Sequence, residues 1–165
     1  MTDGKKRAVS LCILETEEEY LLIRRGKEKN QKEDCVNQYI PIGGKVEALE
    51  TPEDAVIREV KEETGILITN AKLMGVVTET SPLPKYNWVL YIFTSKIKKQ
   101  NPIECREGYF EWIKKEKVTT LPTPEIDQKI YEYVKNNQKF IIHTIYDENL
   151  ILQSAYEYIE EKKLK

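Results

Sequence analysis

The sequence predicts one α/β domain in which a mixed β-sheet lies between helices. Two observations indicate this class: short apolar stretches with the alternation of β-strands recur along the chain, and two segments with helical spacing of apolar residues interrupt them. The 165 residues are a usual size for one domain, and 40% of them are hydrophobic, which suffices for a buried core. The chain has no internal repeat or linker, so 1–165 is expected to form a single domain.

The expected strands are separated by turn residues and by charged segments. The charged stretch 25–37 predicts a surface loop, and the charged residues 160–165 predict a frayed end. Strands are expected at residues 8–14, 20–24, 45–47, 71–80, 85–95, 109–113, 140–146 and 150–155, and 39–42 is a short apolar segment before the two glycines.

The clearest helix is expected between Thr51 and Gly65. Thr51 is a favourable N-cap residue, and Pro52 suits the first helical position because its missing N–H would have no partner there. Gly65 is a typical residue after the end of a helix. A second helix is expected at 124–135, where apolar residues recur at helical spacing.

The overall charge limits the class of partner. The chain has 26 Lys and Arg against 28 Asp and Glu, a formal net charge of -2. Proteins that bind a nucleic-acid duplex usually have a basic face, so no duplex partner is expected. A small anionic substrate is compatible with this charge if metal ions supply the positive charge.

Cysteine, histidine and hydropathy exclude further classes. Cys12, Cys35 and Cys105 are too widely spaced for a zinc or redox motif, and the single histidine, His143, excludes schemes that need two or three. The sequence contains no apolar run of membrane-spanning length, and residues 1–7 lack the apolar core of a signal peptide. A cytoplasmic protein with reduced thiols and no membrane contact is expected.

One constellation of glycines and charged residues spans the loop before the first helix and the helix itself. Glu59, Glu62 and Glu63 share one helical face because they are three and four residues apart. Seven residues of this region stand at fixed offsets: Gly44, Glu50, Arg58, Glu59, Glu62, Glu63 and Gly65. All seven residue types would occur at these offsets by chance at roughly one in 10^8 start positions or fewer.

The chemistry of these residues predicts a metal site. Like charges at this spacing repel by a few tenths of a kcal/mol per pair, and a divalent cation among them would remove that cost. Mg2+ prefers oxygen ligands and often bridges carboxylates to substrate phosphates. A solvated, salt-bridged helix face would explain the three glutamates alone, but it does not explain the Gly-Gly loop, Glu50 and Gly65 together.

The segment 44–66 resembles a complete Nudix box, and the resemblance in fold extends over nearly the whole chain. It implies an α/β/α sandwich around a mixed sheet and hydrolysis of a pyrophosphate linkage in a nucleoside diphosphate derivative. It also implies a Mg2+ cofactor, for which Mn2+ can substitute, and a monomer or homodimer. The implied metal ligands are the carbonyl of Gly43 and the side chains of Glu59, Glu62, Glu63 and Glu107.

The resemblance also implies catalytic roles. Arg58 would orient the glutamates together with Glu50, and Glu62 or Glu107 would be the general base. Glu107 is a candidate because it stands shortly before Trp112, and an ordinary acidic turn residue is an equal alternative.

The substrate is expected to be a small-molecule nucleotide, held by residues outside the box. Arg25 and Lys45 are candidate phosphate contacts, with plain surface charges as the alternative, and Tyr39 and Ser10 are candidate pocket residues. Aromatic residues in the strand 86–93 are expected to line the base cavity on one face, with core packing as the alternative.

The loop 39–46 and the ending 139–152 are similar to the MutT-like branch, which hydrolyses oxidised purine triphosphates such as 8-oxo-dGTP. Two features depart from its animal members: Ile40 replaces a base-recognising asparagine, and the region 121–127, where a tryptophan and paired aspartates clamp the base, has no tryptophan or tyrosine. A nucleotide sugar, ADP-ribose or a pyrimidine nucleotide is therefore the alternative substrate. A non-catalytic nucleotide-binding module and a partner-binding domain are the rival classes.

Overall fold

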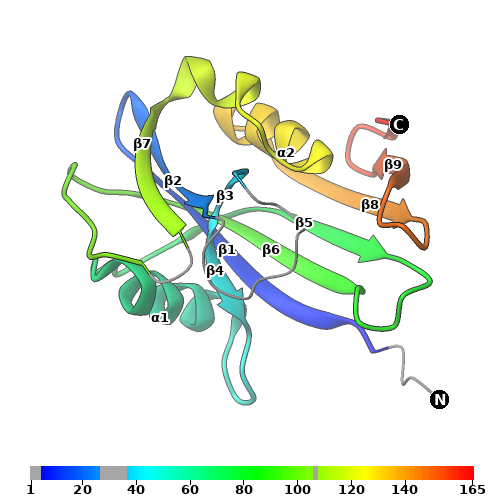
Figure 1. The fold of residues 1–165 in the computed structure, drawn as a ribbon, viewed down its shortest axis with the longest axis horizontal. Coiled ribbons are helices and arrows are strands. Elements are labelled where there is room, and N and C mark those ends of the chain that lie inside the picture. Colours follow the sequence, from blue (N-terminus) through cyan, green and yellow to red (C-terminus); the bar gives the residue numbers. More distant parts are fainter. Residues whose placement is uncertain (1–4, 27–36, 106–107) are drawn as a thin grey trace.

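A computed structural model describes residues 5–26, 37–105 and 108–165. The described strands form one mixed sheet in the order β10-β9-β8-β5-β6-β1-β2-β3, with β4 paired to β1 and β7 paired to β2. Helix α1 lies on one face of this sheet and helix α2 on the other (Figure 1). The predicted α/β/α sandwich around a mixed sheet is therefore confirmed.

The strand bounds agree with most of the expected segments. Their residues are β1 Arg7–Glu15, β2 Glu19–Arg25, β3 Tyr39–Ile40, β4 Ile42–Lys45, β5 Lys72–Thr80, β6 Trp88–Lys96, β7 Gly108–Lys114, β8 Phe140–Tyr146, β9 Leu152–Glu157 and β10 Lys162–Lys163. Parallel pairing of β1 with β6 and of β5 with β8 makes the sheet mixed.

Three local features differ from the sequence expectations. The strand expected at 45–47 lies earlier, as β4 at Ile42–Lys45, because the two glycines belong to it and pair with β1. The apolar segment 39–42 is divided at Pro41, with β3 before it paired to β2. A 3-10 helix, η1 (Lys115–Thr120), was not expected. The tail is not frayed, because β10 pairs with β9 and Lys165 forms an ion pair with Glu125 at 2.9 Å.

Helix α1 (Pro52–Thr64) begins and ends where the sequence predicts. Thr51 and Asp54 form a reciprocal capping box, in which the Thr51 hydroxyl accepts the Asp54 N–H at 3.1 Å. Gly65 follows in the left-handed conformation with a φ of 73°. These local contacts fix the position of the acidic residues along the helix.

Helix α2 (Glu125–Lys135) covers the opposite face of the sheet. The alternation along β1 divides its side chains between two cores: Leu11 and Ile13 pack on the α2 side, while Cys12 and Leu14 pack on the α1 side. Within the described residues, none of the helices is long and apolar enough to cross a membrane.

Candidate active site

The glycine loop and helix α1 meet at Gly44 and Glu59. Strand β4 pairs with β1 so that Gly44 lies opposite Ser10 and Gly43 opposite Leu11. A Cβ atom at position 44 would lie 2.5 Å from Oε1 of Glu59. The missing side chain of Gly44 therefore makes the space in which the Glu59 carboxylate lies against the sheet.

Gly43 is required for a different reason. Its φ of 151° is one that residues with a side chain rarely adopt, and a Cβ there would lie 2.0 Å from the backbone oxygen of Ser10. Gly43 thus brings β4 into close backbone contact with β1. The carbonyl expected to bind a metal belongs to this tightly held residue.

Arg58 is the centre of a network of carboxylates. Its Nε and Nη2 donate to the two oxygens of Glu50 at 2.6 and 3.1 Å, a bidentate arrangement. Its Nη1 donates to Glu59 at 2.8 Å and to Glu62 at 3.2 Å. Nη2 also donates to the carbonyl of Lys45 at 3.1 Å, which ties the helix to the end of β4.

The network has an electrostatic consequence. Hydrogen bonding to Arg58 lowers the pKa of the Glu50 carboxyl, and the same contact raises the pKa of the Arg58 guanidinium. Both groups therefore stay charged at neutral pH. Arg58 is a fixed cation that holds three acidic side chains in place.

The three glutamates expected to bind metal do not converge on one point in this structure. Among the described residues, no three acidic, cysteine or histidine side chains form a group that could hold a metal ion. Glu59 and Glu62 are instead joined through the Arg58 guanidinium, and the Glu62 side chain is 59% exposed. Their donor atoms are all oxygens, the type of ligand that a hard divalent cation prefers.

A hollow lies on the face of the sheet that α2 covers, near the start of α2. It encloses about 210 Å3. Pro41, which directly precedes β4, links it to the glycine loop. Its lining consists of apolar residues of β1, β3 and β6 and three ionisable side chains; the residues are Val9, Leu11, Arg25, Ile40, Pro41, Glu79, Trp88, Leu90 and Asp127.

The structure places the four expected substrate residues in different surroundings. Arg25 lines the hollow. Ser10 does not, because it is fully buried and alternates with Val9 and Leu11, which do. Tyr39 is also buried in the core, where its hydroxyl donates to Glu111 at 2.8 Å.

The remaining candidates are Lys45, expected to contact phosphate, and Glu107, expected to bind metal. Lys45 lies at the exposed end of β4, and only its carbonyl takes part in the Arg58 network. Glu107 lies outside the described residues.

Two carboxyl groups in the hollow were not expected from the sequence. Desolvation and the nearby Glu79 raise the pKa of Asp127 to about 8. Desolvation also raises the pKa of Glu79, whose Oε1 accepts the Tyr146 hydroxyl at 3.2 Å. At neutral pH Asp127 is therefore mostly protonated, so that one wall of the hollow has both a donor and an acceptor.

This raised pKa predicts a pH-dependent stability. Between about pH 4 and pH 8 the folded chain binds a proton at Asp127 that the unfolded chain releases, so stability falls as the pH rises through this window. Asp127→Asn is expected to raise the Tm by about 3–6 °C at pH 9, the effect of roughly 1.5 kcal/mol in a domain of this size. Thermal unfolding at pH 4 should show no such gain.

A matched control is available in the turn after β8. Glu148 is exposed there, and Glu148→Gln removes one carboxyl without changing a buried environment. Its Tm difference from wild type should stay small at both pH values. A gain for Asp127→Asn that is equal at pH 4 and pH 9 would contradict the pKa assignment.

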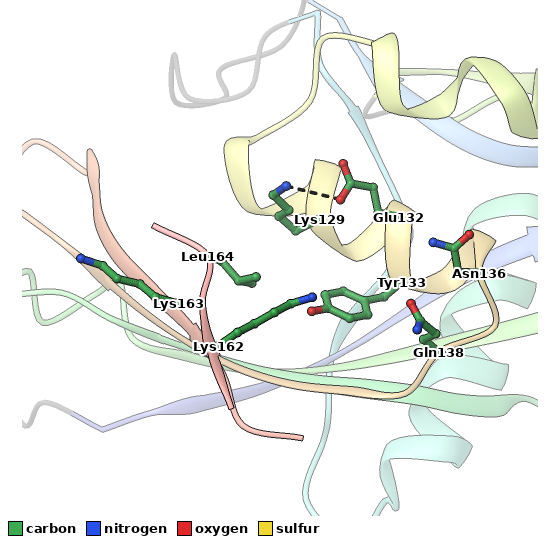
Figure 2. Close-up of a pocket in the computed structure, with 8 residues that line it drawn as sticks. All are labelled: Lys129, Glu132, Tyr133, Asn136, Gln138, Lys162, Lys163 and Leu164. Carbon is green, nitrogen blue, oxygen red and sulfur yellow. Dashed lines mark hydrogen bonds and ion pairs between the residues drawn. The ribbon is translucent and has the colours of Figure 1, made fainter. Parts of the chain in front are cut away.

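Another hollow lies between α2 and the C-terminal strand, away from the glycine loop (Figure 2). Two of its three lysines have glutamate partners: Lys129 pairs with Glu132 at 3.3 Å, and Lys162 pairs with Glu160 and lies 5.5 Å from the Tyr133 ring centroid. None of the residues that line it belongs to the predicted site, so we assign it no part in the reaction.

Comparison with known proteins identifies the family of this site. The NUDIX domain model matches residues 4–134. An uncharacterized Nudix hydrolase of Bacillus subtilis, YvcI, is 30% identical over 134 residues, which are 79% of this chain and 80% of that protein. The crystal structure of a MutT protein from Bacillus halodurans superposes with a TM-score of 0.78 at 26% identity, covering 92% of this chain and 97% of that one.

Two further relatives match part of the chain. An 8-oxo-dGTP diphosphatase of Haemophilus influenzae is 31% identical over 57% of this chain and 68% of its own length. An ADP-ribose pyrophosphatase of Methanocaldococcus jannaschii is 36% identical over 49% of this chain and 45% of its own length. The family match, the fold and the Arg58 network agree, and this chain therefore belongs to the Nudix hydrolases, of the MutT-like type.

Proposed function

We propose that this enzyme hydrolyses a purine nucleoside triphosphate, in its ordinary or an oxidised form such as 8-oxo-dGTP, to the monophosphate and pyrophosphate. The observation that supports this most is the position of the hollow that contains Trp88 and Asp127. It reaches the glycine loop through Pro41, while the acidic residues of α1 reach the same loop through Gly44. The base of a nucleotide could thus lie in this hollow while its phosphate chain lies beside the acidic residues of α1.

The proposed cofactor is Mg2+, with Mn2+ as a substitute, because the donors are oxygens. The carbonyl of Gly43 and the carboxylates of Glu59, Glu62 and Glu63 would hold it, joined by Glu107. Bound there, the ion would neutralise phosphate oxygens and make water a better nucleophile. Nudix hydrolases generally use divalent metal ions.

The chain's own residues have separate tasks in the reaction. Glu62, whose side chain is largely exposed, or Glu107 would accept a proton from the attacking water. Arg58 would act as a positioning residue, since it fixes Glu59 and Glu50 rather than contacting substrate. Catalysis would then rest mainly on orientation and on stabilisation of developing charge.

The base would be recognised in the hollow beside α2. A purine needs flat apolar walls and a few placed hydrogen bonds. Trp88 supplies an aromatic wall, and the Asp127 and Glu79 carboxyls can donate and accept at the edge of a base. Trp88 in β6 would thereby replace the aromatic clamp that is missing from 121–127.

A nucleotide panel tests this proposal. We expect kcat/KM for 8-oxo-dGTP, dGTP or dATP to exceed that for dCTP, dUTP and ADP-ribose at least tenfold, about 1.4 kcal/mol of transition-state preference. Anion-exchange analysis should find the monophosphate and pyrophosphate as products. Trp88→Leu should reduce the purine preference, while Trp112→Leu, a change of the same kind on the other face of the sheet, should not.

Three outcomes would contradict the proposal in different ways. A tenfold preference for ADP-ribose, the substrate named for one relative, or for a pyrimidine nucleotide would refute the purine assignment. A nucleoside diphosphate and orthophosphate as main products would refute the cleavage position. Binding without hydrolysis of any nucleotide in the presence of Mg2+ would support a non-catalytic module.

We place the enzyme in the cytoplasm, as a monomer or homodimer that acts on a small molecule. Cys12 is a buried thiol that forms no disulfide among the described residues, which suits a reducing compartment.

A further inference from the structure

A lysine-rich hollow lies at the C-terminal end of α2. The opposite end of α2 borders the hollow lined by Trp88 and Asp127, the base hollow. The lysine-rich hollow encloses about 670 Å3, a volume typical of small-molecule sites. None of the residues that line it also lines the base hollow. Its four lysines come from four different elements: Lys72 of β5, Lys96 of β6, Lys115 of η1 and Lys135 of α2.

The charges in this hollow are strongly unbalanced. Glu15 is the single carboxylate among its lining residues, and it pairs with Lys115 at 2.6 Å. Glu15 is also the cross-strand neighbour of Lys96, but among the described residues no carboxylate lies within ion-pair distance of Lys72, Lys96 or Lys135. Four lysines and one glutamate give the lining a charge of +3, whereas the whole chain has a net charge of -2.

The sheet register brings two of these cations to one face. Lys72 lies directly opposite Thr94 in the pairing of β5 with β6, and Lys96 follows two residues after Thr94 on the same strand. Both lysines therefore extend from the same side of the sheet as Thr94. The Lys72 ammonium donates to Oδ1 of Asn137 at 2.8 Å, which brings it to the end of α2.

The floor of the hollow is built from buried side chains of the sheet. Tyr20 and Met74 are almost fully buried, and Thr94 adds a hydroxyl group at 6% exposure. The Lys115 ammonium lies 5.0 Å from the centroid of the Tyr20 ring. A hollow with such a floor and four lysines in its lining suits a compact anion better than a long polymer.

The hollow between α2 and the C-terminal strand provides a contrast within the same molecule. There, Lys129 is paired with Glu132 (Figure 2), and Lys162 is paired with Glu160, so two of the three lining lysines have a glutamate partner. Lys72, Lys96 and Lys135 are exposed, and one carboxylate among the lining residues of the lysine-rich hollow does not neutralise four lysines. An excess of one charge in a hollow attracts ions of the opposite sign, so an anionic ligand would explain this group of lysines.

We propose that the hollow formed by Lys72, Lys96, Lys115 and Lys135 is a second ligand site that binds a small phosphate compound with at least two negative charges. Several ammonium groups can contact such an anion as point charges. The site is separate from the acidic residues of α1 and needs no metal ion. Binding of a phosphate compound at this second site does not depend on which nucleotide the enzyme hydrolyses.

Titration with inorganic pyrophosphate tests the site, with EDTA present so that no divalent ion links the anion to the acidic residues of α1. We expect saturable binding that weakens as salt is raised, because exposed charges are screened. Amide resonances of residues 70–74, 94–96 and 134–137 should shift. Orthophosphate and a nucleoside monophosphate, titrated in parallel, show whether charge or a nucleoside is recognised.

A charge-matched pair of variants completes the test. Lys72→Gln with Lys96→Gln should raise the Kd for pyrophosphate at least tenfold. Lys85→Gln with Lys163→Gln removes the same charge at exposed positions outside the hollow and should leave the Kd within twofold. Equal weakening in both variants, shifts confined to α1, or no saturation below 10 mM would overturn the proposal, and the wild-type shifts decide it even if a variant folds poorly.

Discussion

Glu59→Gln is expected to lower kcat by at least about a hundredfold without loss of the fold. The Glu59 side chain is only 16% exposed, yet its carboxylate faces the glycine loop and accepts a hydrogen bond from Arg58 at 2.8 Å rather than packing in a core. Glutamine keeps the shape and an oxygen acceptor, but it removes the charge that would hold a divalent cation. The same loss is expected for Glu62→Gln and for Glu63→Gln.

Stability should hardly change in these variants when no metal is present. Removing one of several neighbouring negative charges relieves repulsion of a few tenths of a kcal/mol, and Arg58 keeps its bidentate contact with Glu50. Steady-state kinetics with Mg2+ and thermal unfolding in EDTA measure the two effects separately. Glu53→Gln, an exposed glutamate in the first turn of the same helix, is the matched control and should keep kcat within twofold. Wild-type turnover in any one of the three site variants would refute the metal-site assignment.

Gly44→Ala is expected to lower kcat by about ten- to a hundredfold while leaving the Tm nearly unchanged. The new Cβ would lie 2.5 Å from Oε1 of Glu59, so this carboxylate has to move. Displacement of a catalytic group by about 1 Å can cost on the order of a hundredfold in rate. The atoms that must move belong to the end of a flexible side chain, so the cost in folding free energy should be small.

The neighbouring glycine gives the opposite expectation. In Gly43→Ala the new Cβ would meet the backbone oxygen of Ser10 at 2.0 Å, and the φ of 151° disfavours any side chain. A loss of a few kcal/mol of stability is therefore expected, visible as a lower Tm. A Gly44→Ala enzyme with wild-type kcat would show that the position of Glu59 beside Gly44 is unimportant for turnover.

Local signals in the sequence were enough for helix α1 and its neighbourhood. The Thr51 cap, the stop at Gly65 and the spacing of Arg58 from the glutamates depend on residues at most a few positions apart. Such contacts form within one helix and the loop before it, so they can be read from spacing. The paired strands and the α/β/α layers followed from the same kind of periodic pattern.

Contacts between distant segments could not be read in this way. Ser10 and Tyr39 were placed beside the substrate, but strand alternation turns Ser10 toward the α1 side and core packing buries Tyr39. Arg58 was expected to orient the glutamates, but which of them its guanidinium joins, Glu59 and Glu62, depends on side-chain geometry that residue spacing does not specify. Spacing predicts which side chains share a helical face, but not which counter-ion each one contacts.

The sequence by itself determined the family, the two helices and the order of the acidic residues, because these depend on local spacing along the chain. Only the tertiary structure decided that Asp127 of α2 and Glu79 of β5 line the same hollow, and that lysines from four elements line another. These meetings depend on strand register and on how α2 crosses the sheet. Both are set by packing of the whole core, where no local pattern of residues specifies the partner.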